Sequence, residues 1–106
     1  MENDIIEGTG NVFADLGLPD ATDRRTRTRL AMAVNAILKE RRLKQADTAA
    51  ILGIPQPKVS ALANYRLDHF SVERIISFLN ALNQDVEIVI RPSREDIGHT
   101  SVRALS

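Results

Sequence analysis

Apolar residues recur with helical spacing in two neighbouring segments at the middle of the chain, roughly residues 45–52 and 56–65. The positions on the two faces are Ala49 and Leu52, then Val59, Leu62 and Ala63. Gly53 lies between the segments and adopts a left-handed backbone conformation at little cost, so it permits a sharp link. The pattern therefore predicts two short helices that close on each other across a tight turn. This is a helix-turn-helix, the unit that lays its second helix in the DNA major groove.

Longer helical patterns flank this unit on both sides. The first is expected to run from an N-cap at Asp20 or Thr22 to about Arg42, and the second to begin at Ser71 and end at Asn83. Their apolar faces comprise Leu30, Val34, Ile37 and Leu38 in the first helix and Val72, Ile75, Ile76, Leu79 and Leu82 in the second.

Over residues 85–91 the apolar residues recur at every second position, which predicts a β-strand that ends at Pro92. A lone strand leaves its peptide groups unpaired, so we expect it to pair with the same strand of a second copy in a two-fold homodimer. Pairing with residues 4–7 of the same chain is the alternative. The apolar residues expected at the dimer interface are Val86, Ile88, Val89 and Ile90.

The remaining parts of the chain are expected to be an N-terminal arm (residues 1–22) and a flexible tail (residues 93–106), on either side of a domain over residues 23–92. Within the arm, one helical turn places three apolar side chains on a common face: Val12, Phe13 and Leu16. These side chains need a surface to cover them, which is either their own domain or a partner protein.

Charge is segregated along the chain although the net charge is zero. Residues 1–23 carry six acidic residues and neither Lys nor Arg, whereas residues 24–44 carry eight Lys or Arg against one Glu. Such segregation suits two faces for two different partners, or simply solvated surface. There is no cysteine and no apolar run of membrane-spanning length, so we expect a cytoplasmic protein with neither disulfides nor a membrane anchor.

The second helix of the motif supplies the candidate DNA contacts. With Val59, Leu62 and Ala63 turned inward, the outward residues are Gln56, Pro57, Lys58, Ser60, Ala61 and Asn64. Gln56 suits bidentate bonding to adenine, Lys58 suits guanine or a phosphate, and Ala61 offers only a methyl group. Phosphate contacts are expected from Lys44, Gln45, Asn64 and Arg66. For each of these residues taken singly, the alternative to a DNA contact is an exposed polar side chain with no functional role. Pro57 fits a first helical turn, where its missing N–H costs nothing.

Catalysis finds little support in the sequence. Neither His69 nor His99 lies in a metal-ligand or nucleophile pattern, and Gly8 and Gly10 lack the setting of a phosphate-binding loop. We therefore predict neither an enzyme nor a cofactor.

Three stretches resemble the Xre/Cro-type helix-turn-helix family, and within it the HigA-like antitoxin and regulator branch. They are GTGNVFADLGLPDA (8–21), QADTAAILGIPQPKVSAL (45–62) and FSVERIISFLNALNQDVEIVIRP (70–92). The resemblance implies an all-α, lambda-repressor-like fold of about five helices with one C-terminal strand. It also implies a prokaryotic, dimeric repressor that binds the operator of its own operon and neutralises a RelE/HigB-like toxin.

The family's DNA-facing places correspond to Gln45, Gln56, Pro57, Lys58, Ser60 and Ala61. The sequence departs from the family where Lys44 and Pro55 replace its usual Thr and Ser helix caps, and in the heavy Arg run at 24–29. Two other hypotheses stay open: a free-standing regulator without a toxin partner, and a protein-binding module whose acidic, apolar arm holds a basic toxin with little role for DNA.

Overall fold

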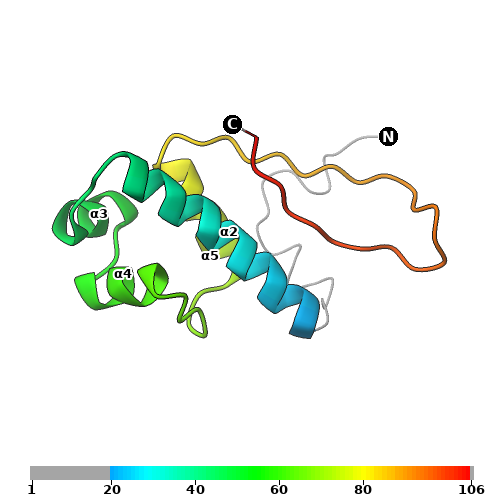
Figure 1. Cartoon of the computed structure of the whole chain (residues 1–106), viewed down its shortest axis with the longest axis horizontal. Coiled ribbons are helices and arrows are strands. Elements are labelled where there is room, and N and C mark those ends of the chain that lie inside the picture. The colour runs from blue at the N-terminus through cyan, green and yellow to red at the C-terminus, as the bar shows by residue number, and fades with distance from the viewer. Residues whose placement is uncertain (1–19, 106) are drawn as a thin grey trace.

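The computed structural model describes residues 20–105, which form four helices connected by short turns (Figure 1). They are α2 (Asp20–Glu40), α3 (Gln45–Leu52), α4 (Gln56–Ala63) and α5 (Val72–Ala81). The mostly helical fold expected from the sequence is confirmed, and α3 has the predicted bounds. The helical turn expected around residues 12–16 lies outside the described residues. No helix in residues 20–105 is long and apolar enough to span a membrane.

One hydrophobic core joins the four helices. The long helix α2 packs against α5 and α4, while α3 packs against α4 and α5. The core consists of Leu30, Ala31, Val34, Leu52, Ile54, Val59, Leu62, Leu67, Phe70, Val72, Ile75, Phe78, Leu79 and Leu82. Phe70 and Phe78 meet edge to face, with ring centroids 5.8 Å apart. Most of the residues predicted for the inner faces are buried, and Ile37, Leu38 and Ile76 pack against the core with part of their surface exposed.

Two polar side chains of α2, and a third from the residue directly after it, bond to backbone carbonyls that are distant in the sequence. The three bonds run from Arg27 Nη1 to the Leu67 carbonyl (2.7 Å), from Asn35 Nδ2 to the Leu62 carbonyl (3.2 Å), and from Arg41 Nη2 to the Leu82 carbonyl (2.8 Å). They reach carbonyl groups at the end of α4, in the loop that follows it, and at the end of α5. The long helix is therefore tied to the ends of α4 and α5 and to the loop between them.

Each of the four helices is followed by a residue in the left-handed backbone conformation. These residues are Arg42 (φ 56°), Gly53 (φ 71°), Tyr65 (φ 59°) and Asn83 (φ 66°). The sequence predicted Gly53 and Asn83 in this role, and both predictions are confirmed. Arg42 and Tyr65 are less expected in this role. Asn adopts the left-handed conformation more readily than other residues with a Cβ, for which it costs about 1 kcal/mol or more relative to glycine.

Residues 84–93 leave the helical body as an extended segment (Figure 1). Within residues 20–105 no β-strand forms, since this segment has no ladder partner among these residues. Val86 packs against the core, whereas Val89 and Ile90 are 64% and 73% exposed and Ile88 is also exposed. The strand predicted over 85–91 required a partner strand, so its pairing stays a prediction.

Candidate DNA interface

The two short helices of the motif both begin without a side-chain cap. Lys44 precedes α3 and Pro55 precedes α4, both with extended backbone and neither with a capping hydrogen bond from its side chain. The missing caps predicted from the sequence are thus confirmed. The first N–H groups of a helix have no intrahelical partner, so those not capped are open to water or to phosphate oxygens. Lys44 and Gln45 are both exposed beside the start of α3.

The outward face of α4 is a stripe at positions i, i+4 and i+7, formed by Gln56, Ser60 and Ala63. Gln56 and Ala63 are exposed and Ser60 is half-buried, while Pro57 is exposed beside them in the first turn. Gln56 is therefore exposed on the first turn of α4, and its role as a base reader stays a prediction.

The prediction for the two alanines of α4 was wrong. Ala61 was expected to face outward, but it is half-buried and packs against the core. Ala63 was expected to turn inward, but it is exposed. The reason is that α4 packs against both α3 and α2, so its buried surface is wider than the line from Val59 to Leu62. The methyl group of Ala63 is therefore exposed, whereas that of Ala61 is partly covered by the core.

Lys58 is exposed, but its ammonium lies over the ring of Phe70, with Nζ 5.9 Å from the ring centroid. This is a cation–π distance, and the ring belongs to the loop that leads into α5. The contact draws Lys58 away from the stripe formed by Gln56, Ser60 and Ala63. The predicted contact of Lys58 with a guanine or a phosphate stays a prediction.

The turn after α4 contains three exposed polar or aromatic side chains, at Asn64, Tyr65 and Arg66. Asn64 Nδ2 donates to the Ser60 carbonyl at 2.9 Å, so this amide group already closes the last turn of its own helix. Arg66 is exposed, and its backbone N–H donates to the Ala61 carbonyl at 2.9 Å. The predicted phosphate-contact residues Asn64 and Arg66 therefore lie together, and of the two only Asn64 has a side chain that hydrogen-bonds within residues 20–105.

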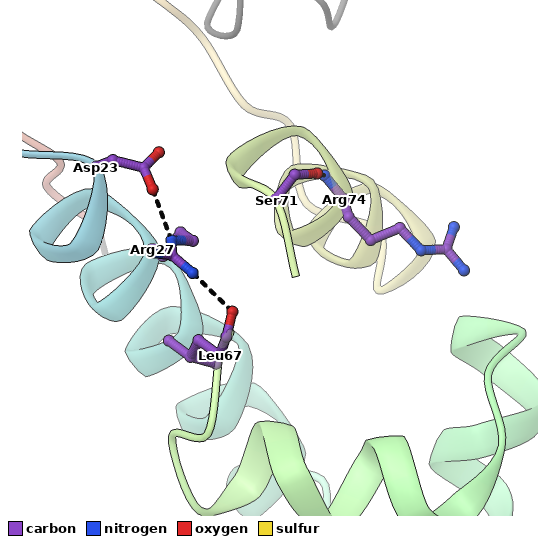
Figure 2. A network of polar contacts seen from close by, with 5 residues as sticks. All are labelled: Asp23, Arg27, Leu67, Ser71 and Arg74. Carbon is purple, nitrogen blue, oxygen red and sulfur yellow. Dashed lines mark hydrogen bonds and ion pairs between the residues drawn. The ribbon is translucent and has the colours of Figure 1, made fainter. Parts of the chain in front are cut away.

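The Arg run of α2 has two different environments. Arg27 turns inward between Asp23 and Leu67 (Figure 2), whereas Arg24, Arg25 and Arg29 are exposed. Arg27 Nε lies 2.9 Å from Asp23 Oδ2, which makes an ion pair by distance although the N–H direction does not meet hydrogen-bond geometry. The strong directed bond of this guanidinium is the one to the Leu67 carbonyl, which anchors the loop after α4.

The candidate contacts of the N-terminal arm, Val12, Phe13 and Leu16, lie outside the described residues. Among residues 20–105, no three His, Cys, Asp or Glu side chains gather in a way that could hold a metal ion. The described surface thus includes two short helices without side-chain caps. Exposed polar and basic side chains lie at the start of α3, along α4 and in the turn after α4.

Two short helices linked at Gly53, with the second presenting Gln56 and Ser60 at the surface, define a helix-turn-helix domain. Residues 12–91 match a protein family described as a helix-turn-helix domain. A solved structure named "Putative XRE Family Transcriptional Regulator" is 53% identical, with a TM-score of 0.74, and the match covers 83% of this chain and 99% of that chain. No curated protein matches the sequence. The chain thus belongs to the helix-turn-helix family, as an XRE-family DNA-binding transcriptional regulator.

Proposed function

We propose that the chain is a repressor that binds a palindromic operator as a homodimer. The observation that supports this most directly is the free outer stripe of α4, which begins with the exposed amide of Gln56. An amide group on the first turn of a recognition helix can bond the N6 and N7 edge of adenine. A two-fold dimer would present two such helices to half-sites about 34 Å apart.

The test is a selection of binding sites from a pool of random-sequence duplexes, carried out with the wild-type chain and with Gln56→Ala. The wild type should enrich a palindrome. Gln56→Ala should relax base preference at one position in each half-site, by about 1–3 kcal/mol of discrimination. Equal loss of affinity on every sequence would refute the role of Gln56 as a base reader.

A matched control is Gln45→Ala at the start of α3. Gln45 is exposed and is assigned to a phosphate, so its loss should weaken all duplexes about equally and leave the selected sequence unchanged. Lys44→Gln and Arg66→Gln should act in the same uniform way and should also reduce the salt dependence, because each removes a cation.

The proposed dimer interface is the extended segment over residues 85–91. Val89 and Ile90 are exposed apolar side chains on a segment whose peptide groups have no ladder partner in the part of the chain that the structure describes. An antiparallel pair of these segments from two copies would pair the peptide groups on the edge of each segment that faces the other copy, and would cover apolar side chains. Val86 already packs on the core, so the pair would be tied to the helical body.

Val89→Pro tests this interface, since proline lacks the N–H that an antiparallel ladder needs. Sedimentation equilibrium should show a dimer for the wild type and a monomer for Val89→Pro, with unchanged helical circular dichroism. If residues 4–7 supply the partner strand instead, removal of residues 1–19 should expose the segment while Val89→Pro leaves the oligomeric state unchanged.

We further propose that the chain is the antitoxin of a HigB/RelE-like toxin. The supporting observations are its resemblance to the HigA-like branch and the segregated charge, with six acidic residues in residues 1–23. An acidic arm with the apolar residues Val12, Phe13 and Leu16 suits a basic partner with an apolar pocket. The alternative is a free-standing regulator of the same family.

Co-expression with a small RelE-like reading frame adjacent to the gene separates these functions. An antitoxin should restore growth and co-purify with the toxin, and removal of residues 1–19 should abolish co-purification while DNA binding continues. Co-purification without the arm would refute the role assigned to it. Absence of any such neighbouring gene would favour the free-standing regulator.

A further inference from the structure

Tyr65 is a bulky residue in a backbone conformation that normally belongs to glycine. Its φ is 59°, at the position that ends the recognition helix α4. The conformation is fixed by two backbone bonds, from Tyr65 N to the Leu62 carbonyl (3.2 Å) and from Arg66 N to the Ala61 carbonyl (2.9 Å). This is the Schellman arrangement, in which a glycine would be accommodated without strain. A strained side chain that persists is a pointer to function.

The tyrosine side chain is not explained by packing. It is 45% exposed and does not belong to the hydrophobic core, whereas its neighbour Leu67 does. The turn that carries it follows α4 directly, and Figure 1 draws α4 and this turn along the same lower edge of the helical body. Arg66 is exposed beside it, so the turn already provides a positive charge at this edge.

The chemistry of a tyrosine suits the DNA backbone. Its ring can pack on a deoxyribose while its hydroxyl donates to a phosphate oxygen, a contact that needs no particular base. We propose that Tyr65 is an additional DNA-contact residue that clamps the sugar–phosphate backbone beyond the end of the recognition helix. The proposal rests on the DNA binding described above and adds a contact that depends on hydrogen bonding and packing but not on charge.

The absence of charge distinguishes Tyr65 from Arg66 in an experiment. Loss of a cation that neutralises a phosphate lowers the slope of log K against log salt by about 1, whereas loss of a neutral hydroxyl lowers affinity at every salt concentration and leaves the slope unchanged. The contact is independent of sequence, so a 30-base-pair duplex of mixed sequence, labelled with a fluorophore, is a sufficient probe.

The experiment titrates this duplex with the full chain at several salt concentrations, using wild type, Tyr65→Phe, Tyr65→Gly and Arg66→Gln. Tyr65→Phe should weaken binding about 3- to 10-fold with an unchanged salt slope. Tyr65→Gly should weaken it further while raising the melting temperature by about 4 °C, because the strain is relieved. Arg66→Gln should weaken binding and reduce the slope.

Asn83→Gly is the matched control, since it changes a left-handed residue at the end of α5, away from α4. It should bind the duplex as the wild type does. Wild-type affinity for both Tyr65 variants would overturn the inference while leaving the proposed regulator intact. Failure of the wild type itself to bind any duplex at low salt would overturn the proposed function, and the inference with it.

Discussion

Arg27 provides the sharpest test of how α2 supports the DNA-binding edge. Its Nη1 donates to the Leu67 carbonyl at 2.7 Å, and its Nε lies 2.9 Å from Asp23 (Figure 2). Arg27→Met keeps most of the apolar stem but removes both polar contacts. The Leu67 carbonyl, in a residue that is only 7% exposed, then loses its charged donor and keeps only the backbone N–H of Phe70 at 3.0 Å.

The expected loss of stability follows from these two contacts. A hydrogen bond from a charged donor contributes about 1.5–3 kcal/mol. The ion pair adds about 0.3–0.5 kcal/mol at most, because the Asp23 side chain is 36% exposed and such i, i+4 surface pairs are weak. Arg27→Met should therefore cost about 2 kcal/mol, which corresponds to a fall in melting temperature of roughly 10 °C for a domain of this size.

The assay is thermal unfolding followed by circular dichroism at one fixed protein concentration, because a dimer melts in a concentration-dependent way. Asp23→Asn should lower the melting temperature by no more than about 3 °C, and Arg25→Met, at an exposed position of the same helix, should leave it unchanged. The reasoning is refuted if Arg27→Met melts within about 2 °C of the wild type, or if Asp23→Asn costs as much as Arg27→Met.

Three other substitutions test the local physics of the fold by urea unfolding. Gly53→Ala should destabilise by about 1 kcal/mol through backbone strain alone, since φ is 71° and a Cβ there meets no atom within 4 Å; unchanged stability would contradict this. Ser71→Ala should cost about 1 kcal/mol because the Ser71 Oγ accepts from Arg74 N at 3.0 Å, and Ser71→Asp should preserve the cap. Ile75→Val should cost about 0.5–1.5 kcal/mol, because Ile75 is fully buried, and a smaller effect would indicate a core that repacks.

The motif itself could be predicted from sequence because its signals are local. Gly53 requires a left-handed turn and Pro57 fits only a first helical turn, so the two residues set where α3 ends and where α4 begins. The same holds for Ser71 and Asn83 at the two ends of α5, since caps depend on bonds within a few residues. These predictions needed no knowledge of tertiary packing.

What the sequence did not predict depends on neighbours that are distant along the chain. The rotation of α4 that buries part of Ala61 and exposes Ala63 is set by packing against two other helices. Lys58 lies over the ring of Phe70, 12 positions along the chain, and Arg27 donates to the Leu67 carbonyl, 40 positions along the chain. The left-handed backbone conformation of Tyr65 could not be predicted from the sequence, because bulky residues rarely adopt it.

The three bonds from Arg27, Asn35 and Arg41 have a consequence for how the protein unfolds. They join residues 40, 27 and 41 positions apart, each pairing α2 or the residue directly after it with a different stretch of chain. A local opening of α4 or α5 breaks a long-range bond to this part of the chain, so partial unfolding is penalised at several places at once. We therefore expect the slowest-exchanging amide protons of α2, α4 and α5 to share one protection free energy, as members of a single cooperative unit.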